Sequence, residues 1–166
     1  DLAALMKYCD SHGRHMTFRA AGTSLNGQAM GDDILVDVKT HFGGMEVREE
    51  GRKLWSRPGV ILGDAQAVLS RHGFMLGPDP GSTSVCTIGG VLADNSGGMR
   101  CSLERDSYHS IEELIFVLPS GTIVDTSRGD EAFRKQEPKL HADLLAFRDK
   151  LRANTEMVKF LRTKFS

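Results

Sequence analysis

The chain carries, over residues 86–98, the stretch Cys86-Thr87-Ile88-Gly89-Gly90-Val91-Leu92-Ala93-Asp94-Asn95-Ser96-Gly97-Gly98. The pair Gly89-Gly90 removes two side chains at a point where something flat or bulky can then lie against the backbone. Thr87 stands where a hydroxyl would cap a short helix over 88–93, and the N-terminus of such a helix favours an anion. The stretch therefore predicts a ligand-binding surface at the start of a short helix.

A stiff segment precedes this stretch. It reads Gly77-Pro78-Asp79-Pro80-Gly81-Ser82, and its two prolines fix two φ angles. Seven of the chain's 18 glycines fall between Gly73 and Gly98. This clustering indicates one continuous loop region rather than separate turns spread along the chain.

Another loop of small residues lies more than 50 positions earlier. It reads Arg19-Ala20-Ala21-Gly22-Thr23-Ser24-Leu25-Asn26-Gly27-Gln28-Ala29. Exposed backbone N–H groups in such a loop form a nest that binds phosphate oxygens without a lysine. Gln28 and Ala29 stand where a nucleotide-triphosphatase loop has Lys and Ser or Thr, and the G-x-G-x-x-G fingerprint is absent. Taken alone, this loop fits a flexible hairpin as well as a phosphate site, whereas two such loops together suit a long ligand.

The remaining pattern predicts an α+β fold of two subdomains. Helices are expected over 2–12 and 61–71, and again beyond Gly129 and over 155–165. The apolar runs at 16–19 and 34–38 are typical of a small parallel β/α subdomain. Hairpins are expected from 45–49 with 53–57, and from 111–118 with 122–125, the second pair forming an antiparallel sheet with helices around it.

Composition excludes several classes of function. A formal net charge of -1 argues against a nucleic-acid platform, which needs a basic face. The apolar runs all stay short of the ~20 residues that span a bilayer. Cys9, Cys86 and Cys101 are odd in number and lack C-x-x-C spacing, so neither a disulfide framework nor a metal site is expected, and the cysteines fit a reducing compartment.

Together these segments resemble the FAD-binding domain of the vanillyl-alcohol oxidase / p-cresol methylhydroxylase (PCMH-type) flavoprotein family. The resemblance is carried by Phe18–Ser24 with Gly27-Gln28, by Pro78–Ser82, by Thr87–Gly90 with Asn95-x-Gly97-Gly98, and by the hairpin Leu114–Thr122. Within the family the chain looks closest to D-lactate dehydrogenase and glycolate-oxidase-like FAD-linked oxidases. Ala20-Ala21 departs from the run of glycines that many members have.

The resemblance implies noncovalent FAD, with the adenine and pyrophosphate across 20–24, the flavin along 87–90 and the adenosine near the strand at 115–119. It implies no catalytic residue in this chain, because the base is expected in a later segment. The implied cofactor-binding residues are Arg19, Ala20, Ala21, Gly22, Thr23, Ser24, Gly27, Gln28, Pro78, Asp79, Gly81, Ser82, Thr87, Ile88, Gly89, Gly90, Asn95, Gly97, Gly98 and Val117.

The activity that the resemblance implies is oxidation of a D-2-hydroxy acid, such as D-lactate or glycolate, by hydride transfer to flavin N5. Residues 1–130 would be the flavin domain, with a first strand before Asp1, and 131–166 a helical segment leading to the rest of the flavoprotein. The fragment alone is expected to be inactive and to hold FAD weakly or not at all. A cytoplasmic location is expected, and peripheral association of the full-length protein with the inner face of the membrane is compatible with it. The resemblance leaves open the electron acceptor and an iron–sulfur cluster elsewhere in the full-length protein.

Two other interpretations stay open at this point. One is a non-catalytic nucleotide- or anion-binding module. The other is a flavin reductase of the cell-wall-precursor type, against which the segment Tyr108–Thr122 argues.

Overall fold

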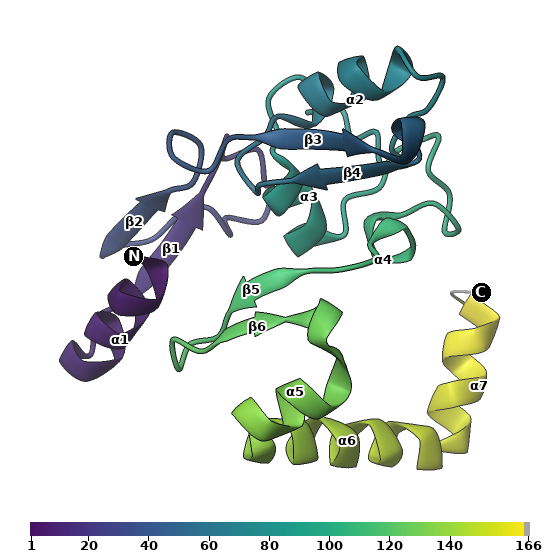
Figure 1. Cartoon of the computed structure of the whole chain (residues 1–166). Coiled ribbons are helices and arrows are strands. Elements are labelled where there is room, and N and C mark those ends of the chain that lie inside the picture. Colours follow the sequence, from purple (N-terminus) through teal and green to yellow (C-terminus); the bar gives the residue numbers. More distant parts are fainter. Residues whose placement is uncertain (165–166) are drawn as a thin grey trace. The chain divides into compact units, whose positions relative to one another are not determined.

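The computed structural model describes residues 1–164 and contains helices and three two-stranded sheets (Figure 1). The chain divides into two compact units. One is Ser11–Ile111, and the other, the terminal unit, joins Asp1–Asp10 to the chain from Glu112 onward. The mixture of helices with small parallel and antiparallel sheets confirms the predicted α+β fold.

The first sheet of the Ser11–Ile111 unit is parallel, as the two buried-type runs predict. Strand β1 (Met16–Arg19) pairs with β2 (Ile34–Asp37), and Met16 lies opposite Ile34. Asp33 fastens the start of β2, because its carboxylate accepts a hydrogen bond from the His15 N–H at 2.8 Å and pairs with the Arg14 guanidinium. The small-residue loop is the connection between these two strands, so both of its ends are held.

The second sheet is the expected hairpin. Strand β3 (Met45–Arg48) runs antiparallel to β4 (Lys53–Ser56) through the short helix η1 (Glu49–Gly51). Its tight turn places Glu49 and Glu50 at φ angles of 50° and 57°. The Arg48 guanidinium lies 6.0 Å from the ring centroid of Trp55, so Trp55 packs on the hairpin.

The core of the unit forms where the glycine-rich region meets helix α2 (Leu62–Ser70). Leu62 is fully buried and packs with Cys86 and Val91. Four backbone hydrogen bonds of 2.8–2.9 Å attach the two segments: Leu62 N–H to Cys86 O, Gly63 N–H to Thr83 O, Ile88 N–H to Val60 O and Gly89 N–H to Pro58 O. Helix α3 (Ile88–Asp94) and the short α4 (Ser107–Ser110) complete the unit.

The terminal unit holds α1 (Leu2–His12) and the second hairpin. Strand β5 (Ile115–Val117) pairs antiparallel with β6 (Ile123–Asp125), and their turn packs on α1, where a Cβ on Gly121 would lie 3.0 Å from the Ala3 carbonyl oxygen. The strand is shorter than the predicted 111–118, because the Ile111 N–H bonds back to Ser107 O and ends α4 instead.

Helices follow the hairpin. They are η2 (Thr126–Arg128), α5 (Gly129–Gln136), α6 (Pro138–Ala153) and α7 (Thr155–Lys164). The buried ring of His141 joins α6 to α5 through its Nε2, 2.9 Å from Asp130 Oδ1, and through an edge contact with Phe133. The predicted last helix is confirmed up to Lys164, and Phe165 lies outside the described residues. None of the helices within 1–164 has the length and apolar character needed to cross a membrane.

Leu62 provides the test of this core. Leu62→Ala removes a fully buried side chain and is expected to lower the free energy of unfolding by about 3 kcal/mol. The matched control, Leu25→Ala, alters a side chain that is 98% exposed and should change it by less than about 0.5 kcal/mol. Urea unfolding followed by circular dichroism measures both, and equal losses would contradict this description of the core.

Candidate functional site

The first turn of α3 begins at Thr87, but not in the way the sequence predicts. Thr87 takes the N-cap position with an extended backbone, yet its hydroxyl makes no capping hydrogen bond. The N–H groups of Ile88 and Gly89 donate instead to the Val60 and Pro58 carbonyls. The prediction that Thr87 caps this helix is therefore wrong, and these two N–H groups are not free for an anion.

The two glycines of this turn have different surroundings. A Cβ on Gly89 would lie 2.5 Å from the Cβ of Pro58, so this glycine is required by packing. A Cβ on Gly90 would meet only the Thr87 hydroxyl oxygen, at 3.7 Å, in otherwise open space. That hydroxyl is buried and has no hydrogen-bond partner among residues 1–164. The open face at Gly90 thus has an unused polar group at its border, as a ligand site would.

The proline-glycine segment is tied to the end of the 86–98 stretch. The Asp79 N–H donates to Gly97 O at 3.2 Å, and Asp79 pairs with Gly98 in an isolated parallel bridge. Arg100 holds the Asp79 carboxylate through its N–H at 3.1 Å and its Nε at 2.6 Å, and these hydrogen bonds lower the pKa of Asp79. The structure therefore brings the proline-glycine segment and the end of the 86–98 stretch together. The Asp79 carboxylate is occupied by its hydrogen bonds to Arg100.

Gln66 supports the same segment from α2. Its side-chain amide donates to Leu76 O at 2.9 Å and to Pro78 O at 3.3 Å, and it accepts the Leu76 N–H at 2.9 Å. The sequence analysis missed this residue, because a glutamine within a helix carries no signal of a tertiary partner.

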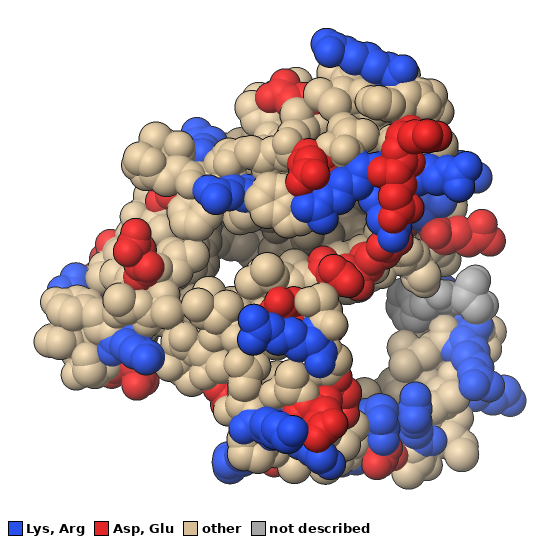
Figure 2. Space-filling model, in the orientation of Figure 1, with Lys and Arg blue, Asp and Glu red and all other residues tan. Residues whose placement is uncertain are grey.

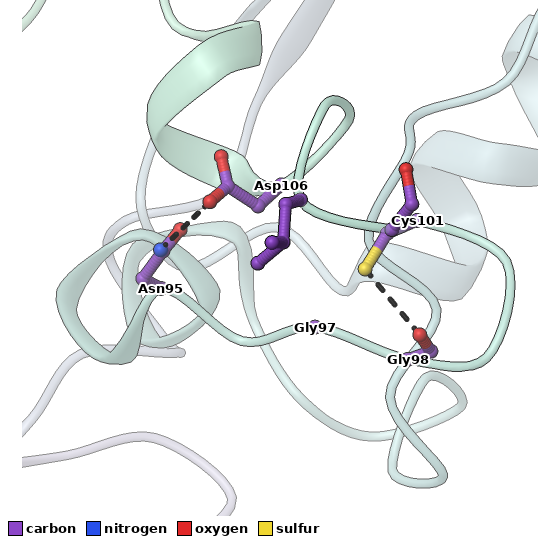
Figure 3. A pocket seen from close by; sticks show the side chains of 7 residues that line it. Asn95, Gly97, Gly98, Cys101 and Asp106 are labelled. Atoms are coloured by element: carbon purple, nitrogen blue, oxygen red, sulfur yellow. Dashed lines mark hydrogen bonds between the residues drawn. The ribbon is translucent and has the colours of Figure 1, made fainter. Parts of the chain in front are cut away.

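A cavity of about 330 Å³ lies beside the glycine pair Gly97-Gly98 (Figure 3). It is lined by Asn95, Gly97, Gly98, Cys101, Ser102, Leu103 and Asp106. The Cys101 side chain is buried, and its thiol donates to the Gly98 carbonyl oxygen at 3.4 Å. The loop from 95 to 106 forms the wall of the cavity.

Asn95 and Asp106 close that loop at its base (Figure 3). Asn95 ends α3 in the left-handed conformation, and its Nδ2 donates to Asp106 Oδ2 at 3.0 Å. Its Oδ1 accepts the Tyr108 N–H at 3.2 Å, while Asp106 also accepts the His109 N–H at 2.9 Å. The hydrogen bond from Asn95, followed by those from His109, lowers the pKa of Asp106 to about 2. The side chain of Asn95 is therefore taken up by protein contacts, and it positions the cavity wall.

The early small-residue loop presents free donors. None of the N–H groups of Ala20–Ser24 donates a hydrogen bond to another group within residues 1–164. Gly22 has a φ of +70°, and the Arg19 guanidinium lies over it, 2.9 Å from where a Cβ would stand. Across the described residues Arg19 has no carboxylate partner, whereas a Ser24–Gln28 side-chain hydrogen bond closes the loop. Unused donors beside a guanidinium suit an anionic group.

All the predicted site residues except Val117 lie in the Ser11–Ile111 unit, and Val117 lies in β5 of the terminal unit. The role of Asp106 was not predicted from the sequence. Its signal is the aspartate directly before the short helix α4, which is a typical N-cap pattern.

Comparison with known proteins identifies the family. The family model described as "FAD binding domain" matches residues 1–127, so the chain belongs to this family and is an FAD-binding domain of flavin oxidoreductases. The resemblance noted from the sequence is thereby confirmed, and FAD is the cofactor.

Individual relatives agree with this assignment. The chain is 30% identical over 123 residues to D-2-hydroxyglutarate dehydrogenase of Pseudomonas putida, a match that covers 73% of this chain and 12% of the relative. It is 30% identical over 131 residues to glycolate oxidase subunit GlcD of Bacillus subtilis, covering 76% and 27%, and 29% identical over 126 residues to D-lactate dehydrogenase of Anaerostipes hadrus, covering 75% and 26%. The chain thus spans between about an eighth and about a quarter of the length of these relatives.

The hydrogen bond from Asn95 to the Asp106 carboxylate predicts that the stability of the fold depends on pH. Because the folded-state pKa of Asp106 is lowered to about 2 from 3.8, its contribution to stability is present above pH 3.8 and is lost as the pH falls toward 2. The difference in free energy of unfolding between the wild type and Asp106→Asn should therefore shrink over that interval.

Urea unfolding at a series of pH values measures this difference. Asn95→Ala removes the partner of the same carboxylate, so its deficit should shrink over the same pH interval. If the loss in free energy of unfolding does not change with pH in either variant, the ionised form of Asp106 is not what stabilises the loop.

Proposed function

We propose that this chain is the FAD-binding part of an oxidoreductase that oxidises a D-2-hydroxy acid, such as D-lactate or glycolate. The names of the relatives support this substrate class, since hydroxyglutarate, lactate and glycolate are all 2-hydroxy acids. The observation that carries the proposal is the open face at Gly90, bordered by the unpaired Thr87 hydroxyl, in a chain of the FAD-binding family.

The residues suggest how the cofactor is held. The free N–H groups of Ala20–Ser24, with the Arg19 guanidinium over them, would bind the pyrophosphate. The flat ring would lie on the side-chain-free surface at Gly90, where the Thr87 hydroxyl gains a partner. Gly97 and Gly98, braced by Asp79 and Arg100, would complete the groove.

Further cofactor contacts are proposed on the same basis. Ile88, Gly89 and Asn95 would contribute van der Waals contact only, because their N–H groups already donate to main-chain carbonyls of the protein. Gly27 and Gln28 would form the far side of the early loop. Pro78, Gly81 and Ser82 would border the groove. Residues 1–130 would form the flavin domain, and 131–166 would lead to further parts of the enzyme.

FAD, when bound, supplies the hydride acceptor for the substrate carbon. The contribution of this chain is to bind and orient the cofactor and to keep water from one face of the ring. The base that takes the hydroxyl proton and the groups that hold the substrate carboxylate would belong to other segments.

The two adjacent glycines of α3 test where the ring lies. Gly90→Ala should leave the melting temperature almost unchanged, because its methyl group enters open space. The same methyl group would displace the ring, so FAD binding should weaken by about tenfold or more. Fluorescence titration of FAD with the purified chain measures the affinity.

Gly89→Ala is the matched control, because it adds the same methyl group at the neighbouring position, where the protein itself fills the space. Its methyl group would overlap Pro58, so the free energy of unfolding should fall by about 1–3 kcal/mol. Unchanged FAD affinity in a fully folded Gly90→Ala variant would exclude this face as the flavin surface.

The early loop is tested by Gly22→Val. The branched side chain would stand where the Arg19 guanidinium lies and would also strain a φ of +70°, so flavin retention should be lost while the fold is kept. Gly13→Val, at a φ of +59° outside the loop, reproduces the strain without touching the site. Stoichiometric flavin in the full-length protein that carries Gly22→Val would place the pyrophosphate elsewhere.

A further inference from the structure

Basic side chains converge where α6 meets α7 in the terminal unit. The helical course breaks at Asn154, whose Oδ1 accepts the Met157 N–H at 3.0 Å and so caps the start of α7. The break brings the last turn of α6 beside one face of α7. The cavity of about 310 Å³ at this place is lined by Arg152, Thr155, Val158, Lys159, Arg162 and Thr163.

The charges of this cavity are unbalanced. Its lining contains three cations and no carboxylate. Among the ion pairs of residues 1–164, none involves Arg152, Lys159 or Arg162, and Figure 2 shows basic side chains along this part of the chain. Some cations of the preceding helices are paired, such as Lys135 with Glu131 at 2.9 Å and Arg148 with Asp149 at 2.8 Å. Arg152, Lys159 and Arg162 thus bring three unpaired cations to the lining of one cavity.

We propose that this cavity binds a small anion that carries a phosphate group. Two guanidinium groups offer paired N–H donors that match phosphate oxygens, an ammonium group adds a third charge, and the hydroxyl of Thr155 adds a neutral donor. The Thr163 hydroxyl is not counted among the donors, because it donates to the Lys159 carbonyl at 2.7 Å. Cations that approach from two helices suit the several acceptors of a tetrahedral oxyanion. Nothing in this proposal depends on the FAD site, which lies in the Ser11–Ile111 unit.

A lipid surface is the less suitable source of the phosphate. At 100° per residue, Met157, Phe160 and Leu161 lie on the side of α7 opposite to Lys159 and Arg162. These apolar side chains are partly exposed. A helix at a bilayer surface buries its apolar face in the membrane, and this orientation would turn the cavity away from the headgroups.

Titration of the 166-residue chain with inorganic phosphate tests the proposal. The ionic strength is held constant with sodium chloride, and the amide NMR shifts of Thr155, Lys159 and Arg162 are followed. The shifts should saturate, and the double variant Lys159→Gln/Arg162→Gln should bind phosphate about tenfold more weakly or worse. The control Lys150→Gln/Lys164→Gln removes the same charge, one cation from α6 and one from α7, outside the cavity lining and should bind as the wild type does.

Other outcomes would overturn the proposal. Shifts that do not saturate, or equal weakening in both double variants, would indicate general charge screening. Arg152→Gln leaves α7 unchanged and should weaken binding by itself, which guards against a loss of helix in the double variant. Cosedimentation with phosphatidic-acid vesicles that requires Lys159 and Arg162 and is not reversed by free phosphate would assign the cavity to a membrane surface instead.

Discussion

The structure of the site depends on how closely two backbone segments approach each other. The chain around Pro58–Gly63 and the chain around Thr83–Gly89 exchange four main-chain hydrogen bonds over the buried Leu62. This approach leaves no room for a Cβ on Gly89. Because Gly89 is held against Pro58, Gly90 faces open space and the Thr87 hydroxyl is left without a partner. A packing requirement at one glycine therefore leaves an open face at the next, which is the face that we propose for the flavin.

Side-chain ties extend this order to the loops around it. Gln66 holds the proline-glycine segment at Leu76 and Pro78, and Arg100 holds it at Asp79. The hydrogen bond from Asn95 to Asp106 closes the loop that surrounds the cavity. None of these side chains needs to touch a ligand to be important. They fix the loops before the cofactor arrives, so less conformational freedom is lost on binding. The early loop differs, since the N–H groups of Ala20–Ser24 have no such partners among residues 1–164, which leaves them free for the pyrophosphate that we propose they bind.

Local patterns in the sequence predicted much of this structure. The parallel pair at 16–19 and 34–38 and the hairpin at 45–57 follow from apolar runs and turn residues, which act within a few positions. Thr87 was misjudged because the N–H groups of Ile88 and Gly89, which it would cap, donate to the carbonyls of Val60 and Pro58, far earlier in the chain. The shortened strand β5 has a similar cause, since Ile111 belongs to the preceding helix turn. Gln66 and Asp106 act through contacts that form only after folding, so single-residue patterns underrate them.

Amide hydrogen exchange followed by NMR, with and without FAD, tests the central claim most directly, because it reports on both glycine loops in one experiment. The account predicts that FAD slows exchange at Ala20–Ser24 and around Gly90 together, with the same dependence on FAD concentration, and leaves the β3–β4 hairpin unchanged. Protection of only one of these two loops, or protection confined to the terminal unit, would contradict the claim that they form one cofactor site.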